Sequence, residues 1–180
     1  MDRLFAEGYA VKSVNSNSVK NVWYVPHFGV QNENKPGKVR LVFDAGHRYA
    51  GSSLNDSLLP GPDLLKSLFG TLVNFRTGRI AIKGDIRDMF LRVKVRAEDR
   101  PYQRFLWRGK DRINPPQVFE MSSLIFGSKS SPCSANYVKN LNAESFKDQF
   151  PESAQSIVSS TYMDDYLESL NSIKEAKKRV

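Results

Sequence analysis

Residues 157–169, IVSSTYMDDYLES, set two adjacent carboxylates among bulky side chains in a chain that is otherwise basic. Asp164 and Asp165 favour a turn. Strand-forming or apolar residues lie on both sides of them: Ile157, Val158, Tyr162 and Tyr166. The pattern predicts a β-hairpin with negative charge at its tip.

Other stretches predict a mixture of strands and helices. Pro36 and Gly37 predict a turn that leads into a strand over residues 39–43. The stretch PGPDLLKSLFGTLVNFRTG predicts an amphipathic helix with Pro62 in its first turn and its end near Gly78. Its apolar residues recur at helical spacing: Leu64, Leu65, Leu68, Leu72 and Val73.

Residues 79–96 predict two strands with a bend, because strand character at 80–82 is followed by Gly84 and then by alternating apolar and basic residues. Ser131 and Pro132 predict the cap and first residue of a second helix. Helices combined with nonlocal strands make the expected fold class α+β.

Composition limits the class of protein. A chain of 180 residues suffices for one domain of ordinary size or two lobes. With 40% hydrophobic and 26% charged residues and no apolar run long enough for a membrane span, the chain reads as globular, with no membrane partner. One cysteine, Cys133, and two histidines exclude an internal disulfide and an ordinary zinc cluster. The first residues, MDRLFAEGYA, show no secretory signal, so a reducing, intracellular setting is expected.

The net charge of +8 and the pI near 9.6 indicate a polyanionic partner. Nucleic acid is the leading candidate, because lysine and arginine that neutralise phosphates release counterions. From charge alone, an acidic membrane surface is the weaker second candidate. A basic but otherwise ordinary soluble protein is an equally open interpretation of the charge alone.

The acidic residues suggest a metal site. If the strand over 80–82 delivers Asp85 beside the hairpin, three carboxylates converge and repel each other unless cations neutralise them. Mg²⁺ prefers such oxygen ligands, and two ions about 3.5–4 Å apart support in-line phosphoryl transfer. Asp164 is the firmer ligand and Asp165 the less certain one, because neighbouring strand residues point to opposite faces. The alternative is an ordinary surface turn.

Several motifs in order resemble the reverse transcriptases of retroelements: KVRLVFDAG, KGDIRDMF, LIFGSKSSPCSAN and YMDD. The pattern is most similar to LTR retrotransposons of the BEL/Pao type and covers residues 20–170. The resemblance implies a fingers and palm arrangement with an antiparallel palm sheet backed by helices and no thumb. Its expected boundaries are an N-terminal extension at 1–19, fingers at 20–59 and 96–117, and palm at 60–95 and 118–180.

The resemblance also implies roles for individual residues. Asp85, Asp164 and Asp165 match the catalytic carboxylates, and the backbone carbonyl of Ile86 is implied as a further metal ligand. The implied nucleotide-binding residues are Arg40, Lys38, Phe90, Phe126 and Gly127, with Phe90 as the gate at the sugar 2′ position. The implied template and primer contacts are Ser131, Pro132, Tyr162 and Met163.

Some of these residues have plainer interpretations. Phe90 in an apolar segment is also typical of core packing, and Ser131 of an ordinary helix cap. Leu124 and Ile125 depart from the Leu-Pro pair of many relatives, which leaves the path of that loop open.

The implied reaction is attack of a primer 3′-OH on the α-phosphate of a deoxynucleoside triphosphate, with two Mg²⁺ ions, or Mn²⁺ as the alternative, at Asp85 and Asp164. The implied partners are an RNA template, a DNA primer and further polyprotein segments: thumb, ribonuclease H and integrase. The setting is intracellular, in the cytoplasm or in retroelement particles. A catalytically inactive remnant that only binds nucleic acid is the alternative. A different metal-dependent nucleotidyl enzyme fits less well, because it would lack the FGSKSSPCSAN segment.

Overall fold

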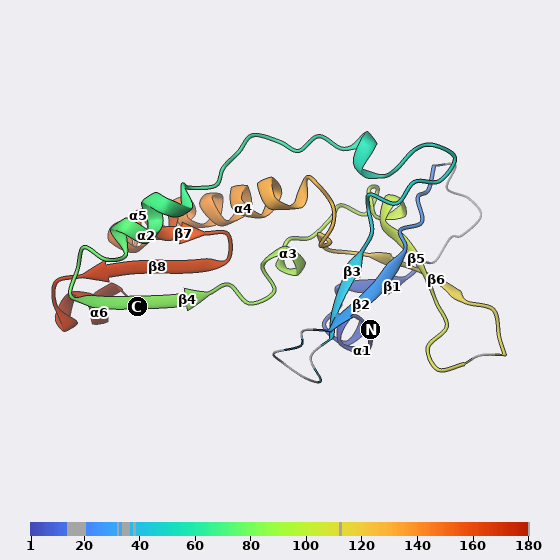
Figure 1. Cartoon of the computed structure of the whole chain (residues 1–180), viewed down its shortest axis with the longest axis horizontal. Helices are drawn as coiled ribbons and strands as arrows, with labels where there is room; N and C mark the ends of the chain where they lie inside the picture. Colours follow the sequence, from blue (N-terminus) through green and yellow to red (C-terminus); the bar gives the residue numbers. More distant parts are fainter. Residues whose placement is uncertain (14–20, 32, 34–36, 38, 112, 180) are drawn as a thin grey trace. The chain divides into compact units, whose positions relative to one another are not determined.

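The computed structural model describes residues 1–13, 21–31, 33, 37, 39–111 and 113–179 (Figure 1). The chain forms two compact units. The first comprises Met1–Pro60 and Phe90–Ser131, and the second comprises Gly61–Met89 and Pro132–Val180. Within the described ranges, no helix has the length and apolar character needed to span a membrane.

The first unit is built on two small antiparallel sheets. One has the strand order β1 (Ala10–Lys12), β6 (Gln117–Met121), β5 (Arg104–Trp107), and the other pairs β2 (His27–Gln31) with β3 (Val39–Phe43). Helix α1 (Asp2–Ala6) precedes β1, and short 3-10 turns cover Asn55–Ser57 and Arg100–Gln103. The core consists of buried apolar side chains from both sheets, among them Phe43, Phe105 and Met121, and from the segments after β3 and β6, which supply Ala45 and Ile125.

The second unit contains a three-stranded antiparallel sheet in the order β4 (Ile80–Asp85), β8 (Asp165–Leu170), β7 (Thr161–Tyr162). Figure 1 shows β4 in green alongside β8 in red. Its helices are α2 (Leu68–Asn74), α4 (Ser131–Ser145), α5 (Pro151–Ser160) and α6 (Ile173–Arg179), and α2, α5 and α6 all contact β8. Along β4, Ala81, Lys83 and Asp85 are exposed while Ile80 and Ile82 are half-buried. The two faces of the strand therefore differ, and the acidic residue lies on the open one.

Two predicted elements are confirmed. The strand over 39–43 is β3, and the helix that begins at Ser131 and Pro132 is α4. Pro36, half of the predicted turn before β3, lies outside the described residues, whereas Gly37 has the positive φ of 85° that such a turn requires.

The helix predicted from Pro62 begins later, at Leu68. Two side chains explain the delay, because each offers the backbone an alternative to the helical bond. The Asp63 carboxylate accepts from the Leu65 amide at 3.0 Å, and the Ser67 hydroxyl caps the helix by accepting from the Gly70 amide at 3.2 Å. The amphipathic pattern is also wrong for this helix, because Leu68, Phe69, Leu72 and Val73 are all exposed.

The predicted bend at Gly84 and the second strand after it are also wrong. Strand β4 runs through Gly84, which pairs with Tyr166, and ends at Asp85. The chain then turns at Asp88, whose φ is 58°, and forms the short helix α3 (Met89–Arg92). The alternating segment that follows makes only an isolated bridge between Lys94 and Ser123.

The predicted hairpin exists, but its first strand is shorter than expected. Ile157 and Val158 belong to α5, which Pro151 begins at a position suited to proline. Strand β7 has only two residues, Thr161 and Tyr162. The turn is made by Met163 and Asp164, with Asp165 already in β8.

Candidate active site

Asp85 and Asp165 lie directly opposite each other at the end of the β4·β8 ladder. Directly opposed residues on antiparallel strands point to the same face, with Cβ atoms about 4.5–5.5 Å apart. The ladder continues past the pair, because the Ile86 amide donates to the Asp164 carbonyl oxygen at 2.8 Å. The strand that begins at Ile80 therefore delivers Asp85 beside the hairpin tip, as the sequence predicted.

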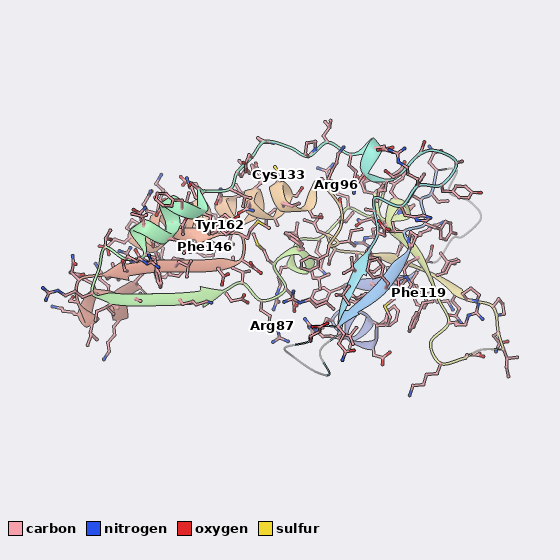
Figure 2. The ribbon with its side chains drawn as sticks, viewed as in Figure 1. Arg87, Arg96, Phe119, Cys133, Phe146 and Tyr162 are labelled. Atoms are coloured by element: carbon pink, nitrogen blue, oxygen red, sulfur yellow. The ribbon has the colours of Figure 1, made fainter. Side chains whose placement is uncertain are left out.

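The hairpin turn is short and strained. Tyr162 and Asp165 pair across it, so only Met163 and Asp164 connect the strands. Met163 has a φ of 54°, a left-handed conformation that costs a non-glycine residue on the order of 1 kcal/mol or more. Asn136 of α4 donates to the Met163 sulfur at 3.9 Å. Figure 2 labels Tyr162, the residue that leads into this turn.

One basic and two acidic side chains lie close together at this end of the β4·β8 ladder. Lys83 Nζ lies 3.6 Å from Asp165 Oδ1, and the two side chains are 69% and 45% exposed, so the ion pair is weak. Asp85 faces Asp165 as a like charge, an arrangement that destabilises a sheet unless a cation neutralises it. These carboxylate oxygens are the donors that a divalent cation of the Mg²⁺ type prefers. The opposed pair therefore fits such an ion.

The expected convergence of three carboxylates is not found. In the described part of the chain, no group of three or more His, Cys, Asp or Glu side chains could hold a metal ion. The register brings Asp85 and Asp165 together, whereas Asp164 occupies the turn and is exposed. A two-residue turn explains this result, because successive residues around it cannot all face one side of the sheet.

The loop at Gly127 in the first unit is tightly built. Gly127 has a φ of 104°, and a side-chain carbon there would collide with the Phe43 carbonyl oxygen. Asn55 secures the same loop from the other side: its amide donates to the Gly127 carbonyl oxygen at 2.9 Å and its oxygen accepts from the Lys129 amide at 2.9 Å. Only glycine fits position 127, so the backbone path of this loop is fixed.

Phe90 and Phe126 pack against each other in the first unit, with ring centroids 4.7 Å apart and a tilt of 54°. Phe90 is buried at 7% exposure, whereas Phe126 is 48% exposed. The pair forms an aromatic step beside the Gly127 loop, one ring supporting the other.

Residues 45–180 match the family model described as reverse transcriptase (RNA-dependent DNA polymerase). The chain belongs to the reverse transcriptase family. Among solved structures, it is similar to the foamy viral protease-reverse transcriptase dRH in complex with double-stranded DNA, with a TM-score of 0.67 and 19% identity. That alignment covers 99% of this chain and 26% of the other, so the chain spans about a quarter of the length of that protein. No curated protein sequence matches the chain.

The likeness confirms the expected reverse-transcriptase-like α+β fold with antiparallel sheets and helices. Reverse transcriptases as a family use divalent metal ions, which agrees with the oxygen ligands offered by the acid pair.

The candidate residues are divided between the two units. The acidic residues and Ile86 belong to the second unit, as do Pro132, Tyr162 and Met163, whereas Arg40, Phe90, Phe126, Gly127 and Ser131 belong to the first. Arg40 lies on the exposed part of β3, opposite Val30. Lys38 lies outside the described residues. The carbonyl oxygen of Ile86 already accepts from the Met89 amide at 3.1 Å and keeps one lone pair for a further ligand.

Ser131 does not cap α4 as an ordinary N-cap would. Its hydroxyl is fully buried and donates to the Ile125 carbonyl oxygen at 2.8 Å, so it anchors the preceding loop instead. This bond also fixes the path of the loop that the Leu124–Ile125 departure left open.

Two contributors to these sites were missed from the sequence. Asn55 holds the Gly127 loop, and Asn136 reaches the hairpin turn. Asn136 lies within the quoted segment LIFGSKSSPCSAN, but the partners of the two amides lie 72 and 27 residues away, so the local pattern gave no signal for either contact.

Proposed function

We propose that this chain carries the nucleotidyl-transfer centre of an RNA-directed DNA polymerase. The observation that supports this most directly is the opposed pair Asp85 and Asp165, held at an exposed sheet edge in a chain of the reverse transcriptase family. The proposed substrates are a deoxynucleoside triphosphate and a DNA primer annealed to an RNA template.

Asp85, Asp164 and Asp165 would hold the Mg²⁺ ions, or Mn²⁺ in their place, with the Ile86 carbonyl as a further ligand. When bound, such ions lower the pKa of the attacking hydroxyl and neutralise charge on the phosphates. Asp164 is exposed at the turn, so its carboxylate is accessible to an ion, whereas Lys83 lies 3.6 Å from Asp165 and would have to give way to one.

The first unit supplies the proposed nucleotide contacts. Arg40 presents a planar guanidinium on an exposed strand, suited to phosphate oxygens, with Lys38 as its proposed assistant. Phe90, supported by Phe126, is the proposed gate against a ribose 2′-OH. Gly127 allows the backbone to approach the nucleotide closely.

We further propose that Ser131, Pro132, Tyr162 and Met163 contact template and primer, and that the element is of the BEL/Pao type. The motifs FDAG, SLNDSLLPGPDLL and FGSKSSPCSAN support the lineage. In this proposal, the fingers comprise 20–59 and 96–117 and the palm 60–95 and 118–180, with thumb, ribonuclease H and integrase segments as partners. The proposed setting is the cytoplasm or a retroelement particle.

Primer extension on an RNA template with Mg²⁺ tests the proposal. Asp85→Asn and Asp164→Asn should each abolish nucleotide incorporation, whereas Asp148→Asn, an exposed acid of the same unit, should not. Equal incorporation by wild type, Asp85→Asn and Asp164→Asn would show that the metal assignment is wrong. If neither the wild type nor any variant incorporates nucleotide but the wild type retains RNA at low salt, the chain is a nucleic-acid-binding remnant without polymerase activity.

A further inference from the structure

Asn136 is a buried amide that the proposed function does not use. It is 2% exposed and lies in the second turn of α4. Its Nδ2 donates to the Pro132 carbonyl oxygen at 2.9 Å and to Met163 Sδ at 3.9 Å. A primary amide nitrogen carries two hydrogens, so these contacts use both. The first fixes the side chain against its own helix, and the second reaches the hairpin turn.

Met163 is the residue of this turn that needs support. Its φ of 54° is a conformation that persists in non-glycine residues when the surroundings impose it. The other side of the turn is tethered by the bond from the Ile86 amide to the Asp164 carbonyl oxygen. The turn is therefore held from β4 through Asp164 and from α4 through Met163.

We propose that Asn136 is a positioning residue: it keeps Met163 in its left-handed conformation and thereby sets where Asp164 and Asp165 present their carboxylates. Its consequence for metal binding rests on the proposed function. Asn136 acts through Met163, so loss of the amide displaces the turn without removing any carboxylate.

Hydrogen exchange of the Ile86 amide reports the position of the turn without any metal, because this amide bonds to Asp164. Asn136→Leu keeps the number and branching of the side-chain heavy atoms and removes both hydrogen-bond donors. It should speed Ile86 exchange by about tenfold or more, while amides at the Ile80 end of β4 keep their rates. Asn142→Leu, an exposed position of the same helix, is the matched control and should leave Ile86 unchanged. An unchanged Ile86 rate in Asn136→Leu overturns the proposal.

The partner residue provides a second test. Met163→Leu removes the sulfur acceptor and leaves Asn136 in place, so it should also speed hydrogen exchange of the Ile86 amide. This variant tests the same contact if Asn136→Leu fails to fold. If both act through one contact, the double variant exchanges no faster than Asn136→Leu alone. If the two substitutions instead multiply each other's effect on the Ile86 exchange rate, Asn136 does not act through Met163, contrary to the proposal.

Mn²⁺ titration separates this proposal from the proposed function. Asn136→Leu should weaken Mn²⁺ binding by about three- to tenfold relative to wild type and Asn142→Leu. Wild type that binds no Mn²⁺ would contradict the metal site, while Ile86 exchange still decides the role of Asn136. Faster exchange with unchanged Mn²⁺ affinity would show that the turn does not set the carboxylates.

Discussion

Asp85 and Asp165 are register partners across β4 and β8, which places two carboxylates side by side on one exposed face of a three-stranded sheet. Directly opposed like charges lower the stability of a sheet. A cation that binds between the two carboxylates removes this repulsion and raises the stability of the sheet. The arrangement therefore links the stability of the second unit to divalent ions.

Asp85→Asn should stabilise the metal-free protein, by a few tenths of a kcal/mol and at most about 1 kcal/mol, because it removes the like-charge contact. The same change should abolish the rise in melting temperature that millimolar Mg²⁺ gives the wild type. Thermal unfolding with and without Mg²⁺ measures both effects. Asp148→Asn should shift neither, and a variant Asp85→Asn that still responds to Mg²⁺ would place the ion elsewhere.

Lys83→Gln should tighten Mn²⁺ binding by about three- to tenfold, because a unit charge about 4 Å away interacts by about 1 kcal/mol even in water. Lys83 now occupies the space beside Asp165 and competes with an incoming cation. Mn²⁺ titration at low and high salt checks the effect, which should shrink as salt rises. Lys174→Gln in α6 is the control. Weaker binding in Lys83→Gln would mean that the lysine supports the ion.

The acid pair could be predicted from the sequence because its members sit at the ends of strands with clear β character. The hairpin residues 162–165 and the strand that begins at Ile80 are local patterns, and pairing them requires only that they share a sheet. The limits of the elements were less predictable. The apolar spacing places the start of the second-unit helix at Pro62, but the helix begins at Leu68. This later start depends on the hydrogen bonds of Asp63 and Ser67, which the spacing does not indicate.

The contacts that shape the candidate sites could not be predicted from the sequence. Asn55 reaches the Gly127 loop and Ser131 anchors the Ile125 carbonyl, both through bonds that depend on the tertiary fold. The failure of three carboxylates to converge has a similar origin. The position of Asp164 depends on which two residues form the hairpin turn. A shift of the β7·β8 register by one residue would turn each side chain of the strand to the opposite face of the sheet.

Gly127→Ala should destabilise the first unit by more than about 2 kcal/mol, because it combines backbone strain with a collision against the Phe43 carbonyl oxygen. Gly51→Ala is the matched control: Gly51 has a φ of 84° but open space around it, so strain alone should cost about 1 kcal/mol. Urea unfolding of both variants measures the difference. Equal losses would show that the loop at Gly127 can move away from Phe43.

Tyr166 should make stability fall at high pH. Its hydroxyl bonds to Ser156 of α5 at 2.7 Å and donates to Glu168, which pairs with Arg179 of α6 at 3.3 Å. Burial, then the hydrogen bond to Glu168, raises the pKa of Tyr166 from 10.0 to about 12. The unfolded chain therefore loses this proton at lower pH than the folded chain does. The stability that the neutral hydroxyl contributes is complete below about pH 10 and is lost as pH rises toward about 12.

Tyr166→Phe should cost about 1 kcal/mol at neutral pH, because its hydrogen-bond partners lose the hydroxyl. The gap between wild type and Tyr166→Phe should then narrow between about pH 10 and about pH 12, since only the wild type carries the titrating group. Urea unfolding at several pH values measures the difference in free energy of unfolding between the two proteins. Titration of the other tyrosines and of the lysines affects both proteins alike and drops out of this difference. Tyr137→Phe, at a position 58% exposed, should show no such narrowing. A gap that stays constant across this range would mean that Tyr166 titrates alike in the folded and unfolded chains.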